Sequence, residues 1–341
     1  MKKKNIILLF VLTIIILFFT MKDNYKEIID ALLNINIFWV IISYLLVLSY
    51  TFFKTLVTHD VINSFKKNKF NNTFFIQIIT FFFNAITPFC TGGQPFQVYM
   101  FNKSGNKLVD STNTVVQETI IHQIALLVVG ITSIVLNSVF NIIELDGMLS
   151  LFLGVGFLVN VSTILLLLVL SNTKKINKII INFFLKIISI FKKVDKEKEK
   201  IYDSIEKFNT NSKLLLKNKL RFIKLILMNA FALICLYLVP VTLMFSLGYS
   251  DLFNSITSIV LVTFTSLISC FIPLPGGTVA QEYVFIVLFS AFVSNPLVST
   301  LMILWRFITY YFPLIVGAII LNIKQKDFFT KSQQKSCDKV C

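Results

Sequence analysis

The sequence predicts an all-α polytopic membrane protein with about six full spans and two opposed re-entrant helical hairpins, related as an inverted repeat. Three observations support this class. Hydrophobic residues make up 56% of the 341 residues and charged residues only 14%, against about 45–50% and about 25% in soluble domains. The apolar residues gather in runs, most of them near the length of about 20 residues that crosses a bilayer. Basic residues gather between these runs, which sets their orientation.

Composition argues against the other broad classes. Five cysteines are too few for a disulfide scaffold, and an aromatic content of 14% is too apolar for a disordered chain. The net charge of +15 comes from lysine, since Arg221 and Arg306 are the only arginines among 32 basic residues. Nucleic-acid surfaces favour clustered arginine. We therefore expect no direct nucleic-acid partner.

The first element is an apolar run from Ile6 to Met21 that follows Met1 and three lysines. It resembles a signal peptide, but no small-residue cleavage site follows it, so we expect a retained first span. Further apolar runs occupy residues 37–57, 73–90, 114–140, 148–170, 220–247, 255–272, 279–293 and 298–322.

Loop charge sets the sidedness of these runs. The basic stretches are 2–4, 66–69, 103–107, 172–219 and the tail after Lys324, whereas the poorly basic ones are 22–36, 141–147, 248–254 and 294–297. Because cytoplasmic loops carry the excess of Lys and Arg, both termini are expected in the cytoplasm. The signs alternate only if the run at 73–90 enters from the cytoplasm and returns, while the run at 255–272 does so from outside. The two hairpins then point at each other.

This pattern predicts one integral membrane domain over residues 1–325 and a basic cytoplasmic tail over 326–341. Within the domain we expect the first hairpin at 73–101, the second at 255–293 and a cytoplasmic amphipathic helical loop at 172–219. In that loop, polar residues recur every three to four positions from Lys178 to Lys193. This spacing is typical of a basic helix that lies on anionic lipid.

Each predicted hairpin contains a proline, then a glycine pair, then a polar residue at the start of a returning helix. Proline ends a helix and glycine permits a close turn. In hydrocarbon, such a break survives where protein buries it or where it lines a polar cavity, and paired breaks of opposite orientation are typical of transporter binding sites. The alternative is that the breaks only kink two packed spans. From the hairpins we assign to a lipid-binding site Pro88, Gly92, Gly93, Gln94, Pro273, Gly276 and Gly277, with the glycine N–H groups as headgroup donors.

Four ionisable residues lie inside apolar runs: Glu118, His122, Glu282 and Arg306. A charge at the bilayer centre costs at least about 2.5 kcal/mol, so these residues face an interior or a pathway. The Arg306 guanidinium can hold a lipid phosphate with two hydrogen bonds, and the alternative is an ion pair with Glu282 or Glu118. We add Glu118, Glu282 and Arg306 to the lipid-binding set.

Glu118 and His122 lie one helical turn apart, a spacing that metal ligands or a proton relay use. No third ligand is evident in the sequence, so we expect a satisfied interior pair and no metal site. The sequence also contains no nucleophile elbow, P-loop or dinucleotide fingerprint. We therefore expect neither catalytic residues nor a cofactor.

These motifs resemble the lysylphosphatidylglycerol synthase transmembrane family, the membrane half of the bacterial multiple peptide resistance factor, which also occurs as stand-alone flippase-like proteins. The resemblance covers residues 5 to 325. Its matching residues are Thr87-Pro88, Gly92-Gly93-x-Pro95, Pro273-x-Pro275-Gly276-Gly277, Glu282, Arg306 and Tyr310-Tyr311. The second hairpin departs from the family's usual Gly-x-Gly continuation, because Thr278-Val279-Ala280 follows the glycine pair.

The resemblance implies translocation or presentation of aminoacylated phosphatidylglycerol, which lowers negative surface charge and gives resistance to cationic antimicrobial peptides. One alternative is that the chain is, or is a subunit of, a phosphatidylglycerol lysyltransferase. In two-part members a separate cytoplasmic domain transfers lysine from lysyl-tRNA; we find no such domain here and expect no transfer by this chain alone. Expected partners are anionic or aminoacylated phospholipids, a separate lysyl-lipid synthase or glycosyltransferase, and a second copy of the chain.

A second alternative is a translocator of polyprenyl-phosphate-linked sugars. A lysyl headgroup needs acidic partners such as Glu118 and Glu282, whereas a sugar headgroup favours aromatic and amide contacts. The sequence supplies both kinds of side chain near the breaks, the latter kind being Tyr99, Tyr283, Gln94 and Gln281. The headgroup therefore stays open at this point.

Overall fold

The computed structural model describes residues 29–30, 32–87, 90–172, 218–249, 254–269 and 280–321. These residues form helices, turns and connecting loops, with no strand among them. The helices are α3 (Ile37–Asn63), α4 (Phe70–Ala85), α5 (Gly93–Lys103), α6 (Leu108–Phe140), α7 (Gly147–Asn172), α10 (Lys219–Tyr237), α11 (Val239–Ser246), α12 (Ser255–Ser269), α13 (Ala280–Phe289), α14 (Asn295–Arg306) and the π-helical turn η1 (Phe307–Tyr311).

The predicted class, an all-α polytopic membrane protein, is confirmed. Among the described residues five helical stretches are long and apolar enough to cross a membrane: Ile37–Asn63, Leu108–Phe140, Gly147–Val169, Lys219–Ser246 and Pro296–Leu321. Several predicted elements lie outside the described residues. They are the first span at 6–21, the bulk of the loop at 172–219, the tail at 326–341, and Pro88, Pro273, Gly276 and Gly277.

Local sequence explains where several helices begin and end. The Asn36 side chain accepts a hydrogen bond from the Phe38 N–H at the start of α3, and Asn218 accepts from the Arg221 N–H at the start of α10. Such caps satisfy N–H groups that have no partner inside the helix. α6 ends at Asn141, whose left-handed backbone (φ 47°) is tolerated by asparagine better than by most residues.

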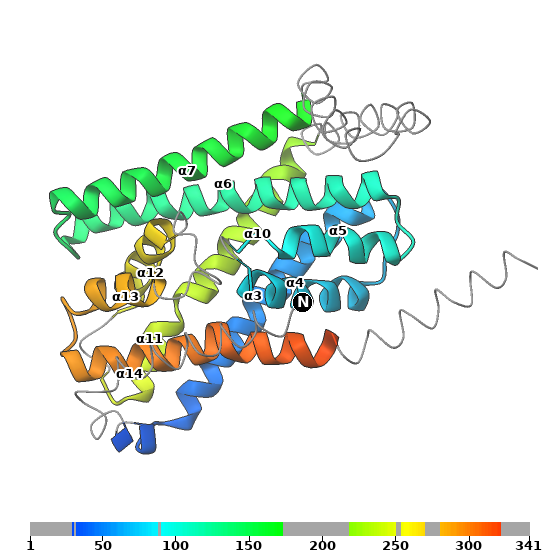
Figure 1. The fold of residues 1–341 in the computed structure, drawn as a ribbon. Helices are drawn as coiled ribbons and strands as arrows, with labels where there is room; N and C mark the ends of the chain where they lie inside the picture. Colours follow the sequence, from blue (N-terminus) through cyan, green and yellow to red (C-terminus); the bar gives the residue numbers. More distant parts are fainter. Residues whose placement is uncertain are drawn as a thin grey trace, which may run out of the picture.

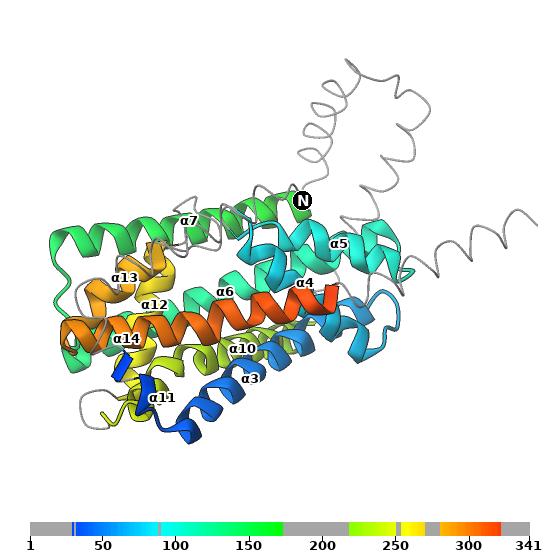
Figure 2. The ribbon, with the colours of Figure 1, turned by 60° about the horizontal axis from the view of Figure 1, so that its bottom comes forward.

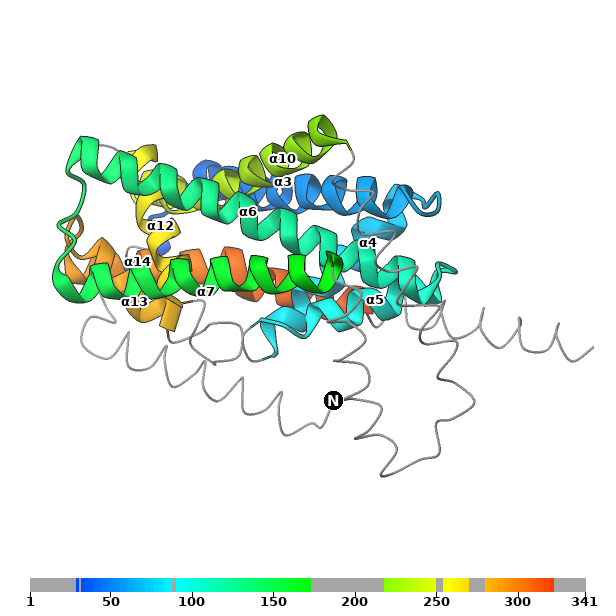
Figure 3. The ribbon, with the colours of Figure 1, turned by 90° about the horizontal axis from the view of Figure 1, so that it is seen from above.

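The short helices form two pairs at opposite ends of the bundle. α4 packs against α5, and α12 packs against α13. Figures 1, 2 and 3 show α4 and α5 toward one end of the long helices α6, α7 and α14, with α12 and α13 toward the other end. These pairs correspond to the segments in which the sequence predicts hairpins, and we call α4–α5 the first helix pair and α12–α13 the second.

The loops at the two ends differ in charge. At the α4–α5 end, Lys66 Nζ donates to the Gly105 carbonyl at 2.7 Å, which joins loop 64–69 to loop 104–107. The α6–α7 loop, with Glu144 and Asp146, lies at the α12–α13 end (Figure 1). The fold therefore places these two basic loops at one end and this acidic loop at the other.

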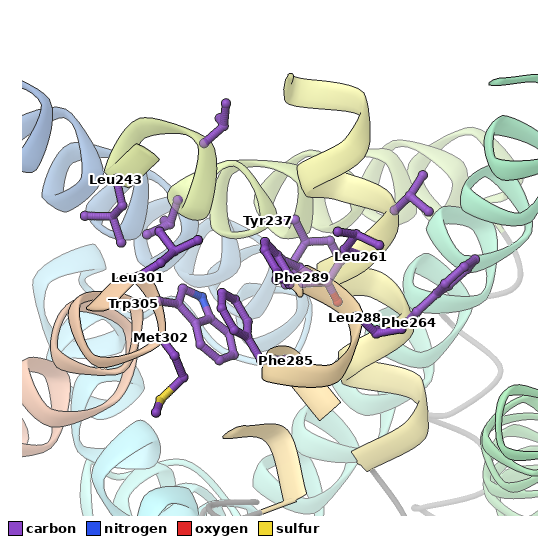
Figure 4. Close-up of a cluster of buried hydrophobic side chains, with 14 of the residues drawn as sticks. Tyr237, Leu243, Leu261, Phe264, Phe285, Leu288, Phe289, Leu301, Met302 and Trp305 are labelled. Atoms are coloured by element: carbon purple, nitrogen blue, oxygen red, sulfur yellow. The ribbon is translucent and has the colours of Figure 1, made fainter. Parts of the chain in front are cut away.

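An aromatic core connects the second helix pair to α14. Phe285 on α13 stacks on Phe289 at 3.8 Å between ring centroids and on Trp305 of α14 at 4.6 Å. Figure 4 shows these rings beside Tyr237 and Leu301. In contrast, Leu151 and Leu158 on the outer face of α7 are 63% and 68% exposed, as lipid-facing side chains are. The core thus holds α13 against the turn of α14 that precedes Arg306.

Candidate functional site

A cavity of about 250 Å³ lies among the helix pairs and α14. The first helix pair and its turn contribute Asn84, Ala85 and Cys90, and the second pair contributes Ser266 and Gln281. Arg306, Thr309 and Tyr310 complete this side from α14 and η1. Residues that flank both predicted hairpin breaks therefore line one space.

Arg306 is the charged side chain of the cavity wall in the described part of the chain. It is 3% exposed, and its Nε donates to Glu282 Oε1 at 3.2 Å. Its Nη1 donates to Gln281 Oε1 at 2.9 Å. The guanidinium carbon lies 5.2 Å from the ring centroids of both Trp305 and Tyr310. Two α13 side chains, one α14 ring and one η1 ring thus orient the guanidinium. Of the two carboxylates that the sequence left open as partners of Arg306, the structure shows Glu282.

The π-helical turn after Arg306 fixes the first helix pair as well. Such turns widen a helix locally and are frequent at functional sites. Tyr310 in this turn donates its hydroxyl hydrogen to the Ala85 carbonyl at 2.8 Å. Ala85 is the last residue of α4, where carbonyls lack a partner inside the helix. One stretch of α14 and η1 therefore contacts both helix pairs, through Arg306 and through Tyr310.

The glycine pair of the first hairpin has a different role from the expected one. The Gly92 N–H donates to Thr87 Oγ1 and the Gly93 N–H to Asn84 Oδ1, both at 2.8 Å. These N–H groups, predicted as headgroup donors, are used inside the hairpin. A Cβ at Gly93 would lie 2.6 Å from the Thr80 carbonyl oxygen, so the pair lets α5 start directly against α4.

Glu118 belongs to a second buried ion pair, between α3 and α6. Its Oε1 lies 3.1 Å from Lys54 Nζ, with the two side chains 7% and 11% exposed. His122, one turn further, places Nδ1 3.0 Å from Asn229 Oδ1 on α10. Glu118 and His122 are thus partnered by other helices and not by each other. Lys54 is not among the predicted site residues, although a lysine inside the apolar run at 37–57 indicates an interior partner.

Some of the predicted site residues lie at the cavity and others do not. Arg306 lines it and Glu282 contacts Arg306, whereas Gln94 and Glu118 are not part of the wall. Several lining residues were not predicted from the sequence, and each has a polar group inside an apolar run. These are Tyr50, Thr51, Asn84, Tyr237, Ser266 and Thr309.

Fold and site together define a multi-pass membrane protein with a buried arginine beside an interior cavity. The sequence model described as "Lysylphosphatidylglycerol synthase TM region" matches residues 6–317. The chain belongs to this family, as its motifs predict. It is also 27% identical over 294 residues to a UPF0104 membrane protein of Archaeoglobus fulgidus, in an alignment that covers 76% of this chain and 78% of that protein.

Proposed function

We propose that this protein moves a phospholipid headgroup across the bacterial plasma membrane through the Arg306 cavity. The observation that carries the proposal is a buried guanidinium in a cavity that residues of both helix pairs line. Arginine binds phosphate with paired, charge-assisted hydrogen bonds. A headgroup that enters the cavity exchanges water for these donors, so it avoids an unpartnered charge in hydrocarbon while its acyl chains stay in lipid.

We also propose an orientation of the protein in the membrane. The basic loops that contain Lys66 and Lys103 face the cytoplasm under the positive-inside rule, and the loop with Asp146 faces outward. Both termini are then cytoplasmic. The first helix pair enters from inside and the second from outside, an arrangement suited to alternating access at a shared cavity.

Cysteine labelling in intact cells tests this orientation. A membrane-impermeant thiol reagent added outside is expected to label Asp146→Cys and to leave Lys103→Cys unlabelled until the cells are opened. Labelling of position 103 from outside would contradict the proposed sidedness.

At the cell surface, export of phosphatidylglycerol or its lysyl form changes the charge of the outer leaflet, and export of the lysyl form gives resistance to cationic antimicrobial peptides. We place lipid movement ahead of lysyl transfer because residues of the membrane helices line the site. Presentation of a lipid to another enzyme without its transfer across the bilayer is the competing version of the proposal.

Reconstitution in liposomes tests lipid movement. Wild type is expected to expose labelled phosphatidylglycerol to an impermeant quencher, and Arg306→Ala to lose that activity. Arg306→Lys keeps the charge but not the planar pair of donors, so its rate should lie between them. Arg221→Lys is the matched control, because Arg221 pairs with Asp60 away from the cavity and its change should leave the rate unaltered.

Two results would overturn parts of the proposal. Equal rates for wild type and a folded Arg306→Ala variant would remove Arg306 from the site. No movement of any lipid by folded wild type would favour presentation over translocation.

A further inference from the structure

The wall of the cavity is not suited to a cationic headgroup. Among the described residues that line it, Arg306 carries charge and none is acidic. A lysyl headgroup would bring two ammonium groups and one phosphate beside Arg306, and like charges repel strongly in a medium of low dielectric constant.

The two carboxylates that a lysyl group would need already have cationic partners. Glu282 accepts from Arg306 Nε at 3.2 Å through Oε1, while its Oε2 has no hydrogen-bond partner among the described residues. Glu118 lies 3.1 Å from Lys54 Nζ. Both acidic side chains are buried, at 3% and 5% exposure. Taking either one from its partner would leave a buried charge unpaired, which is costly.

Aromatic rings offer a second way to hold an ammonium group, but the rings next to Arg306 are already used. Its guanidinium carbon lies 5.2 Å from the centroids of both Trp305 and Tyr310. A further cation at these rings would meet the guanidinium at close range. Cation–π binding of a lysyl ammonium at these two rings is therefore unfavourable.

The remaining wall is suited to hydroxyl groups. Thr51, Ser266 and Thr309 donate their own hydroxyl hydrogens to backbone carbonyls of their helices, so their oxygens stay able to accept. Rings of Tyr50 and Tyr237 line the same space. Acceptor oxygens beside flat rings match a polyol, whose hydroxyls donate while its C–H groups pack against aromatic faces.

The size of the cavity agrees with a headgroup and not a whole lipid. Its volume is about 250 Å³, below the about 300–1,000 Å³ of sites for drug-sized ligands. A lysine ester adds a long side chain with a terminal ammonium group to phosphoglycerol. No described residue of the cavity wall has a carboxylate that could pair with this ammonium group.

From these features we propose that the cavity selects an anionic lipid whose headgroup is a phosphate with a neutral polyol, and that it disfavours a lysyl headgroup. The inference rests on the proposed function and names its substrate class. Two lipids share this chemistry, phosphatidylglycerol and a polyprenyl-phosphate-linked hexose.

The test compares three labelled lipids in liposomes that contain full-length protein: phosphatidylglycerol, a polyprenyl-phosphate hexose and lysyl-phosphatidylglycerol. At least one polyol phosphate lipid should move faster than the lysyl lipid by about tenfold or more, and the faster of the two identifies the source of the headgroup. A lysyl lipid that moves as fast or faster would overturn the inference while leaving lipid movement intact. If no lipid moves, the proposed function itself fails.

A pair of variants separates selectivity from folding. Glu282→Gln keeps an oxygen that can accept from Arg306 but removes the charge that orients the guanidinium, so we expect the rate of every lipid to fall and the preference for the polyol phosphate lipids to persist. A selective loss of lysyl-lipid movement in this variant would identify Glu282 as an ammonium partner and contradict the inference. Glu118→Gln, the matched buried carboxylate outside the cavity wall, should leave the ratio of lipid rates unchanged even where it lowers the amount of folded protein.

Discussion

The two buried ion pairs of this protein look alike in isolation and differ in what surrounds them. Lys54 and Glu118 approach to 3.1 Å, and Arg306 and Glu282 to 3.2 Å, with each of the four side chains largely buried. Lys54 and Glu118 join α3 to α6 and stand apart from the cavity wall. Arg306 is the last residue of α14, directly before the π-helical turn η1, and lines the cavity.

Burial and ion pairing alone therefore do not identify a binding site. Both pairs carry the desolvation cost of charges inside a membrane. Only Arg306 combines its ion pair with a planar donor group, flanking rings and adjacent space. We therefore assign Lys54–Glu118 to the packing of α3 against α6 and Arg306–Glu282 to both packing and headgroup binding.

The largest expected difference comes from replacing each pair by apolar residues of similar volume. Such replacements often leave stability intact. Arg306→Met with Glu282→Leu should give folded protein whose lipid movement falls by more than about tenfold, because the phosphate partner is gone. Lys54→Met with Glu118→Leu should retain lipid movement within about twofold, since the cavity wall keeps its charge. Liposome assays at matched protein levels measure both, and equal losses in the two double variants would end the distinction.

Removing one partner of the Lys54–Glu118 pair tests how much this pair contributes to the stability of the protein. Lys54→Met leaves Glu118 buried and unpaired, which should destabilise the protein by about 3–5 kcal/mol. Thermal unfolding in detergent measures the loss. Adding Glu118→Gln should recover much of it, because the remaining amide carries no charge; failure of this rescue would show that Lys54 acts through packing and not through its ion pair.

A substitution in the first helix pair should have a smaller effect. It tests whether the close packing of α5 against α4 is needed for the shape of the cavity. In Gly93→Ala the new methyl group would overlap Asn84 Oδ1 and would lie 2.6 Å from the Thr80 carbonyl oxygen. Relief of this overlap should cost about 1–3 kcal/mol and should slow lipid movement, because Asn84 lines the cavity. Gly154→Ala on α7 is the control, since a Cβ there meets nothing within 4 Å. Equal unfolding temperatures for the two variants would contradict the described turn.

The smallest expected effect concerns the hydroxyl that joins η1 to α4. Tyr310→Phe removes the donor to the Ala85 carbonyl and leaves the ring in place, so stability should fall by about 1 kcal/mol. Tyr283→Phe serves as control because Tyr283 is 70% exposed on α13. A shift in unfolding temperature as large for Tyr283→Phe as for Tyr310→Phe would argue against this contact.

Much of the fold could be predicted because bilayer crossing is a property of chain segments. A run such as 114–140 must be helical in hydrocarbon to satisfy its own backbone, whatever its neighbours are. The residues Pro88, Gly92 and Gly93 likewise predict an interruption between two helices, and α4 ends at Ala85 while α5 begins at Gly93. Loop composition adds an expected sidedness through the same local reasoning.

Partners within the membrane could be decided only by tertiary structure. From the sequence, Arg306 has two candidate carboxylate partners, and Lys54 is not identified as the partner of Glu118. The reason is that the distance between side chains on different helices depends on which helices pack together. The same holds for the glycine N–H groups, whose acceptors Thr87 and Asn84 come close only when α5 folds back on α4. Hydrophobicity and backbone hydrogen bonding depend on residues close together in the sequence, so the sequence determined the helices. Ion pairs and the shape of the cavity depend on contacts between different helices, so only the packed bundle decided the site.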